Sequence, residues 1–140
     1  TITRPFNYTG VGQQSKFIVP KIVEHFKQKS STLQLGNIDV WRDFSDVRWI
    51  AEAYTKLLSS PIHGLSIVNL CSGNLICIRE VIDTLQKITG NKLNIEIDDA
   101  LVRQADIKRQ CGNNNKIFEL LPTLSSPIAF KDTLNWMLKS

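Results

Sequence analysis

Three polar residues that lie far apart in the sequence have side chains suited to holding an anion: Asn7, Arg42 and Arg103. Arg42 stands in the strand-like segment WRDF, where a guanidinium must face solvent or pair with a buried anion, because burying it unpaired costs much free energy. Its planar fork suits two phosphate oxygens, whereas a lysine offers a single point charge. Asp43 cannot be assumed to be its partner, since neighbours on a strand face opposite ways. From these residues alone a surface or ion-paired arginine is the simpler interpretation, and a phosphate site is the alternative.

The segment Gly10-Val11-Gly12 follows a strand-like opening and could bring backbone amides close to the pyrophosphate of a dinucleotide. The third glycine of that fingerprint is missing, because Ser15 stands three residues after Gly12. No acidic residue closes a second strand about 20 residues further on either. We therefore interpret this segment as a tight turn.

The cysteines and histidines (Cys71, Cys77, Cys111, His25 and His63) show no metal-ligand spacing, so we expect no bound metal. Free thiols favour a reducing compartment. No stretch approaches the ~18 apolar residues of a membrane helix, and no leader-like segment opens the chain. We expect a soluble, cytoplasmic protein with no membrane partner.

The chain has 17 Lys and Arg against 13 Asp and Glu, and the resulting net charge of +4 favours anionic partners. Lys108-Arg109 is the one adjacent basic pair, and the other basic residues are scattered rather than gathered as in proteins that bind nucleic acids. A small phosphorylated ligand therefore fits the charge better than a nucleic acid does.

The spacing of apolar residues predicts an α/β chain of mixed helices and short strands. Helices are expected at 17–29, 47–58, 78–88, 115–121 and 128–138. Strands are expected at 1–6, on both sides of a turn at 36–39, at 93–97, and at 65–71, the last buried on both faces. Loops are expected at 7–14 and 98–115. So few short strands cannot complete a doubly wound sheet, but they could flank one.

A family resemblance covers essentially the whole chain. It rests on five ordered blocks: RPFNYTGVGQ, FIVPKIVEHF, LQLGNIDVWRDFSDVRWIAEAYTKLL, IVNLCSGNLICIREVIDTLQKITG and LVRQADIKRQCGNNNKIFELL. In order and spacing these blocks resemble the C-terminal half of the extended short-chain dehydrogenase/reductases, the NAD-dependent epimerase/dehydratase family. Within it they look most like the GDP-4-keto-6-deoxymannose reductases and the GDP-mannose 4,6-dehydratases. The resemblance implies that residues 1–140 form the nucleotide-sugar-binding domain, with residues 1–6 as the tail of the Rossmann half.

The family's catalytic signatures are absent from this chain. It contains no Tyr-x-x-x-Lys motif and no Gly-x-x-Gly-x-x-Gly fingerprint, so no catalytic residue is assigned and we expect the chain alone to be inactive. The first residue is Thr1 rather than Met, which fits a piece of a longer polypeptide. The resemblance implies that NAD or NADP is bound mainly by the missing half.

The resemblance assigns roles to five residues near the reacting groups. Pro5 and Phe6 are expected to lie near the nicotinamide of the cofactor. Asn7 is expected to donate a hydrogen bond to the substrate diphosphate, and Arg42 and Arg103 match the two diphosphate-binding arginines of the family.

The helix after FIVP lines the base pocket in relatives, so Phe17, Val19 and Lys21 are expected near the nucleotide. Two departures from the family pattern stand out. Residues 103–106 read Arg-Gln-Ala-Asp where the family often has Arg-Pro-x-Asp, so a stiffened turn is lost. Cys77 stands where a serine commonly caps the next helix, and a thiol is a weak cap.

The function that the resemblance implies is nucleotide-sugar binding in an NAD(P)-dependent epimerase, dehydratase or reductase, with a GDP-sugar as the expected substrate. The alternative is a binding or regulatory module that kept the fold and lost catalysis. Two protein partners are also expected: the N-terminal Rossmann half, and a second copy in a homodimer. In related enzymes the dimer interface comes mainly from the half that is missing here.

Overall fold

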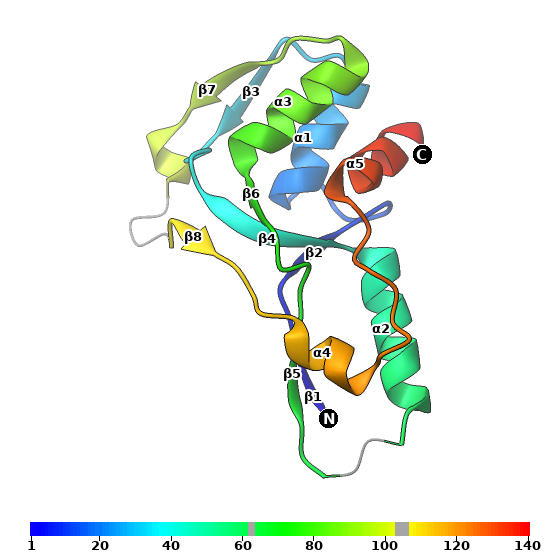
Figure 1. Ribbon diagram of the computed structural model, residues 1–140. Coiled ribbons are helices and arrows are strands. Elements are labelled where there is room, and N and C mark those ends of the chain that lie inside the picture. The colour runs from blue at the N-terminus through cyan, green and yellow to red at the C-terminus, as the bar shows by residue number, and fades with distance from the viewer. Residues whose placement is uncertain (62–63, 103–106) are drawn as a thin grey trace.

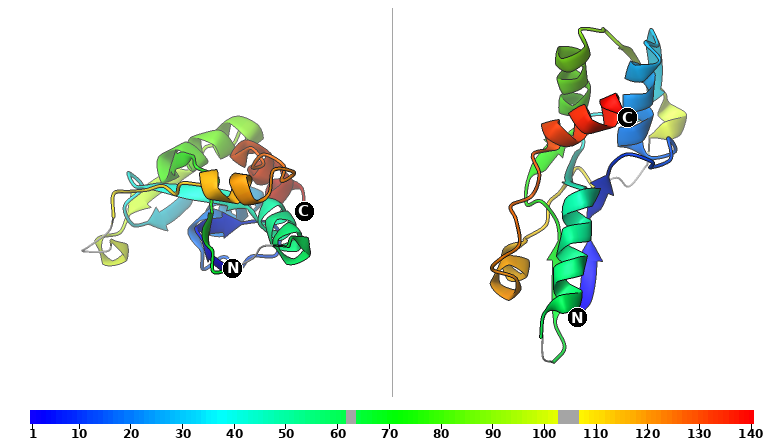
Figure 2. Two further views of the ribbon diagram at one scale, coloured as in Figure 1. Left: turned by 60° about the horizontal axis from the view of Figure 1, so that its bottom comes forward. Right: turned by 90° about the vertical axis from the view of Figure 1, so that its right-hand side faces the viewer.

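The computed structural model describes residues 1–61, 64–102 and 107–140. Strand β4 (Trp41–Asp46) crosses the middle of the molecule (Figure 1). It pairs in parallel with β2 and β8 and antiparallel with β6. These three short strands have the bounds Asn7–Thr9 (β2), Leu75–Cys77 (β6) and Arg109–Gln110 (β8). Figures 1 and 2 show an elongated molecule, with one lobe on either side of β4.

The upper lobe in Figure 1 packs three helices together beside a two-stranded parallel sheet. Its elements are α1 (Ile18–Lys27), β3 (Thr32–Leu35), α3 (Ile78–Thr89), β7 (Asn94–Ile97) and α5 (Phe130–Lys139). Their apolar stripes form one core, in which Ile22 and Leu85 are fully buried. Phe44 of β4 reaches this core and stacks on Phe130 with ring centroids 5.3 Å apart.

The lower lobe holds the second parallel pair and two helices. Its elements are β1 (Ile2–Pro5), α2 (Val47–Ser59), β5 (Ile67–Leu70) and α4 (Asn115–Leu120). Trp49 of α2 and Ile117 of α4 pack with Val68 and Leu70 into a separate core. The Trp49 indole nitrogen also donates to the Ser125 carbonyl over 2.8 Å, so the polar end of this buried ring has a partner.

The predicted helices and the mixed α/β class are confirmed, and three other sequence predictions are corrected. Residues 7–9 form β2 rather than a loop, because they pair with the end of β4. Strand β5 is not buried on both faces, since Ile67 is 39% exposed while Val68 is 1% exposed. The polar segment 98–115 includes β8 and a short 3-10 helix at Asp99–Leu101.

Helix ends follow the expected chemistry. Gly90 takes the left-handed conformation (φ +72°) that ends α3, where a side chain would add strain. At the start of α3 the Glu80 carboxylate accepts a hydrogen bond from the Cys77 backbone over 2.9 Å, so the helix is capped from its third residue despite the weak thiol. Within the described residues, no helix is both long and apolar enough for a membrane span.

Asp46 caps α2 and connects it to α5. Its side chain is buried and accepts hydrogen bonds from the Arg48 backbone (2.8 Å), the Arg48 guanidinium (2.7 Å) and the Thr133 hydroxyl (2.8 Å). Burial acts to raise the pKa of this carboxyl, but the bonds from Arg48 and Thr133 outweigh it and hold the pKa below its ordinary value. The Arg48 guanidinium also lies over the Trp136 ring, 3.9 Å from its centroid.

We expect Asp46→Asn to lower the free energy of unfolding at pH 7 by about 1–3 kcal/mol, because the amide cannot accept all of these bonds. Since the folded pKa is depressed, the carboxylate stabilises the fold above its ordinary pKa, and that contribution is lost as the pH falls through the folded value. Urea unfolding of both proteins at pH 7 and at pH 3 should therefore show a smaller difference at pH 3. The exposed Asp83→Asn is the control and should change little at either pH. An equal difference at both pH values would contradict this role of the charge.

Candidate functional site

A pocket of about 450 Å³ opens where segment 6–9 passes the start of α1. It is lined by Phe6, Asn7, Tyr8, Thr9, Gln13, Phe17, Ile18, Val19, Pro20 and Phe44. Four of the predicted site residues lie together here: Phe6, Asn7, Phe17 and Val19. The lining combines aromatic and aliphatic surface with a few amides, which is typical of pockets that bind small ligands.

Parallel pairing positions the first part of this pocket. β1 and β5 run in parallel register up to the pair Pro5 and Leu70, and the Phe6 backbone N–H donates to the Leu70 carbonyl over 2.9 Å. The chain then enters β2, where Asn7 lies opposite Phe44 of β4. The pocket thus lies outside the carboxyl end of a parallel strand pair, where ligands bind in open α/β sheets.

Asn7 is exposed, and its side-chain amide donates a hydrogen bond to the Asp43 carbonyl over 3.4 Å. This bond holds the amide against β4. Because an NH₂ group carries two hydrogens, the second can go to a ligand oxygen.

Arg42 lies two residues before Phe44 on β4, so both side chains leave the strand on the same face. The guanidinium is half-buried, and its Nη1 donates to the Trp41 carbonyl (2.8 Å) and to the Ile107 carbonyl (2.6 Å). Arg42 therefore joins β4 to the segment that begins at Ile107. Arg103, the other predicted diphosphate arginine, lies outside the described residues.

Arg42 does not line the pocket, and neither do the remaining predicted residues that the structure describes, Pro5 and Lys21. Pro5 is exposed at the end of β1, directly before Phe6. Lys21 lies on α1, and its Nζ donates to the Gln34 carbonyl of β3 over 2.9 Å. The structure therefore gives Lys21 a bond between α1 and β3 and does not bring it to the predicted residues that line the pocket.

Sequence reasoning missed six lining residues: Tyr8, Thr9, Gln13, Ile18, Pro20 and Phe44. Thr9 donates to the Gln13 side chain over 2.7 Å, and Gln13 donates to the Tyr8 carbonyl over 3.2 Å. Gly12 adopts φ +85° and allows the chain to fold Gln13 back onto β2. The tight turn expected at Gly10–Gly12 could have indicated Gln13, because a turn there brings the next polar side chain back to the preceding strand.

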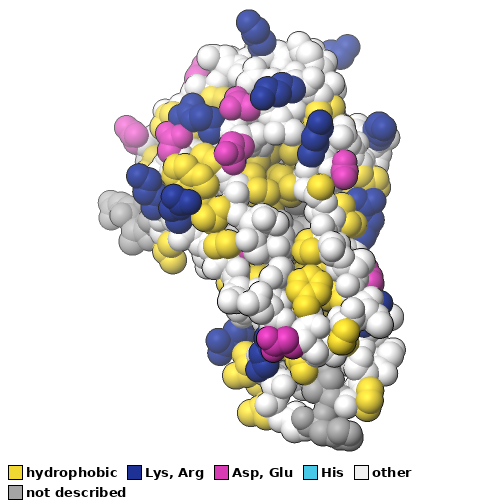
Figure 3. Space-filling view, in the orientation of Figure 1, with side chains coloured by type: hydrophobic (Ala, Val, Ile, Leu, Met, Phe, Trp, Pro, Cys, Tyr) yellow, Lys and Arg dark blue, Asp and Glu magenta, His cyan; other side chains and the backbone are white. Residues whose placement is uncertain are grey.

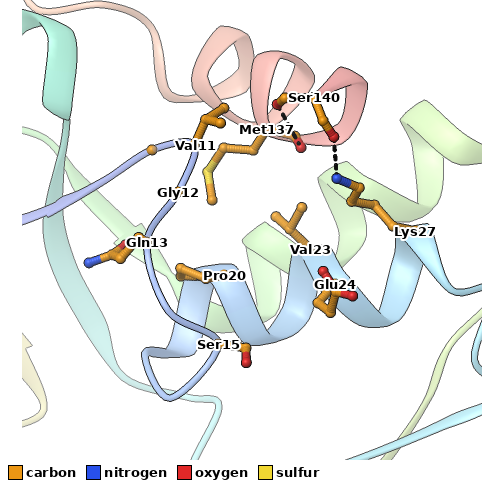
Figure 4. A pocket seen from close by; sticks show the side chains of 11 residues that line it. Val11, Gly12, Gln13, Ser15, Pro20, Val23, Glu24, Lys27, Met137 and Ser140 are labelled. Atoms are coloured by element: carbon orange, nitrogen blue, oxygen red, sulfur yellow. Dashed lines mark hydrogen bonds between the residues drawn. The ribbon is translucent and has the colours of Figure 1, made fainter.

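A second, smaller pocket of about 260 Å³ lies on the other side of this turn, between α1 and the end of α5 (Figure 4). Met137 and Val23 give it an apolar floor. The Lys27 ammonium at its edge already donates to the Ser140 carbonyl, as Figure 4 shows. Among the residues that the structure describes, no predicted site residue lines this pocket.

Buried Cys71 directly follows β5. Burial and the nearby Asp43 charge raise the pKa of its thiol to about 12, and the same causes raise the pKa of the Cys111 thiol. We expect Cys71 to resist alkylation in the folded protein, because the reactive species is the thiolate. Iodoacetamide at pH 8 followed by peptide mass spectrometry should leave Cys71 unmodified until denaturant is added. Rapid labelling of the native protein would contradict this expectation.

Figure 3 shows how charge is distributed over one face of the molecule. Lys and Arg side chains are scattered there among Asp and Glu side chains. Arg79 pairs with Asp39 on the surface over 2.8 Å. The basic excess thus forms no continuous stripe on this face for a nucleic-acid backbone to follow.

Comparisons with known proteins show what this chain is similar to. A model of the NAD dependent epimerase/dehydratase family matches residues 1–71, which include β1, β2, α1 and β4. GDP-6-deoxy-D-talose 4-dehydrogenase of Aggregatibacter actinomycetemcomitans is 34% identical over 86% of the chain. GDP-6-deoxy-D-mannose reductase of Pseudomonas aeruginosa is 36% identical over 84% of the chain. The chain spans only 41% and 40% of the length of these two proteins.

The fold is also that of a solved relative. The structure of RMD from Pseudomonas aeruginosa complexed with NADPH superposes with a TM-score of 0.88 at 32% identity. That match covers 98% of this chain and 46% of the other.

Proposed function

The chain belongs to the NAD dependent epimerase/dehydratase family, and we propose that it is the nucleotide-sugar-binding half of an NAD(P)-dependent reductase or dehydrogenase acting on a GDP-sugar. The observation that carries this proposal is the pocket that gathers Phe6, Asn7, Phe17 and Val19 from two separate elements. Arg42 on the same face of β4 as the lining residue Phe44 adds the positive charge that a diphosphate requires. The two GDP-sugar enzymes at 34% and 36% identity favour a guanine nucleotide.

Each part of the ligand has a chemically suited partner in this proposal. Asn7 and Arg42 bind the diphosphate, and Arg103 is the proposed second arginine. The base lies against the exposed ring of Phe17. Val19 lies behind it in the pocket wall, with a side chain that is only 1% exposed.

The chain offers an apolar edge rather than a full site for the cofactor. Pro5 and Phe6 fit the face of a nicotinamide ring, which supplies or accepts the hydride when NAD(P) is bound. The glycines at Gly10–Gly12 form the turn that folds Gln13 onto β2, so they do not fit the phosphate-binding loop of a dinucleotide site. We propose that the rest of the cofactor is bound by the Rossmann half, with residues 1–6 as the end of that half.

The β1–β5 pair supports this division of the protein. Its inner face packs on α2 and α4 through Val68 and Leu70. Its outer face exposes the directly paired Ile2 and Ile67, at 50% and 39%. Parallel sheets are ordinarily covered on both faces, so we propose that the Rossmann half covers this one. A homodimer and a cytoplasmic location stay predictions from the sequence.

Calorimetric titration of the full-length protein with GDP, UDP and dTDP tests the base and the diphosphate together. We expect GDP to bind at least about tenfold more tightly than the other two, a difference of about 1.4 kcal/mol. Equal affinities would contradict a guanine-specific pocket.

Hydride transfer is followed separately as nicotinamide absorbance with a GDP-4-keto-sugar. GDP binding without any hydride transfer would favour the alternative, a binding module that lacks catalysis.

A further inference from the structure

Asp43 is a fully buried carboxylate (0% exposed) at the meeting point of three chain segments. Its Oδ1 accepts hydrogen bonds from the Ser72 backbone (2.8 Å) and the Ser72 hydroxyl (2.7 Å). Its Oδ2 accepts from the backbone N–H groups of Gly73 (3.0 Å) and Gly112 (3.2 Å). These four N–H and O–H donors from two loops, with a longer bond of 3.8 Å from the Cys111 thiol, therefore satisfy a charge that would otherwise be costly to bury.

The same residue also accepts a hydrogen bond from one proposed diphosphate ligand, Asn7, and is the sequence neighbour of the other, Arg42. Its backbone carbonyl accepts the Asn7 side-chain amide over 3.4 Å. Arg42 is its immediate neighbour on β4 and faces the opposite side of the strand. One residue thus supports Asn7 through its backbone and the two loops through its side chain.

Segment 107–112 is held along β4 at both of its ends. At the first end Arg42 donates to the Ile107 carbonyl, and at the last the Gly112 N–H donates to Asp43. Gly112 also packs tightly, since a Cβ on it would come within 2.4 Å of the Cys71 sulfur and 3.0 Å of the Phe6 ring. Movement of Gly112 would therefore be transmitted to Phe6 in the pocket wall.

We propose that Asp43 is a positioning residue for nucleotide-sugar binding: it fixes segment 107–112 and the Ser72–Gly73 turn against β4, so that Asn7, Arg42 and Phe6 hold one binding geometry. This inference rests on the proposed function. Asp43 does not touch the ligand; it acts through these three residues and through the segment that Arg42 contacts at Ile107.

Asp46 is the matched control. It is a second buried aspartate on β4, three residues further on, and it too accepts several hydrogen bonds. Its partners Arg48 and Thr133 lie on α2 and α5, away from segment 107–112. Asp43→Asn and Asp46→Asn make the same chemical change, so a general loss of stability affects both variants.

The experiment measures GDP affinity of the full-length protein by calorimetry for Asp43→Asn, Arg42→Ala, the double variant and Asp46→Asn. Asp43→Asn should weaken GDP binding roughly 10- to 100-fold, since the amide cannot replace all four bonds. In the Arg42→Ala background the same change should weaken GDP binding by a smaller factor than in the parent protein, because the part of the effect that acts through Arg42 is already lost. Hydrogen exchange should rise in segment 107–112 and stay unchanged in α1. Asp46→Asn should unfold more easily yet bind GDP within about threefold of the parent protein.

Wild-type GDP affinity in Asp43→Asn would overturn the positioning role, and so would an equal loss with and without Arg42. If Asp43→Asn does not fold, Ser72→Ala replaces it: this variant removes one donor to Asp43 and should produce a smaller loss in the same direction, again coupled to Arg42. Failure of the parent protein to bind GDP would instead count against the proposed function, and the role of Asp43 would fall with it.

Discussion

Replacing Arg42 with alanine is expected to weaken GDP binding by the full-length protein roughly 10- to 100-fold, because a charge-assisted fork to the diphosphate is lost. Arg42→Lys should fall in between, since it keeps the charge but not the planar pair of donors. Calorimetry with GDP and with guanosine separates the causes: the loss should appear with GDP and be nearly absent with guanosine.

Arg79→Ala is the matched control for this prediction. Arg79 forms a surface pair with Asp39, and both side chains are 55% exposed. Its removal should change GDP affinity by less than about twofold, because exposed pairs contribute little. Unchanged GDP affinity in Arg42→Ala would show that Arg42 does not bind the diphosphate. Equal losses of GDP affinity in both arginine variants would show that only the net charge of the protein matters.

The second large effect is expected on the outer face of the β1–β5 pair. Ile67→Asp in the full-length protein should lower the free energy of unfolding by about 3 kcal/mol, because the proposed Rossmann half would bury the new charge. Urea denaturation measures this change. The control is Ile97→Asp on β7, where the isoleucine is 53% exposed and no covering half is proposed. Ile97→Asp should lower the free energy of unfolding by less than about 1 kcal/mol.

Comparable costs at Ile67 and Ile97 would contradict the proposed coverage of the β1–β5 pair. Ile67 is already 39% exposed within this chain. Contacts within the chain therefore account for only part of a large loss of unfolding free energy in Ile67→Asp.

The sequence predicted the helices well because each carries a wide apolar stripe and clear end signals. Gly90 and Asp46 are examples, since a left-handed cap and a side-chain cap depend on residues close by in the sequence. Short strands were harder to predict. β2 has only Asn7–Thr9 to mark it and exists through pairing with β4, whose Phe44 lies 37 residues beyond Asn7.

The candidate site shows the same limit. Asn7 and Phe17 could be proposed from the family resemblance, and the structure brings both to one pocket. Lys21 could not be placed from its position in the sequence, because its direction on α1 is set by the bond to Gln34. Asp43 was recognised only as a poor partner for Arg42, since its true partners, Ser72 and Gly112, are distant in the sequence.

The most direct test of the nucleotide-sugar site is a crystal structure of the full-length protein with NADP(H) and a GDP-sugar. The diphosphate should lie within hydrogen-bond distance of the Asn7 amide and the Arg42 guanidinium, with the base against Phe17. Density for the nucleotide in the smaller pocket beside Met137, or anywhere out of reach of Asn7 and Arg42, would contradict the account.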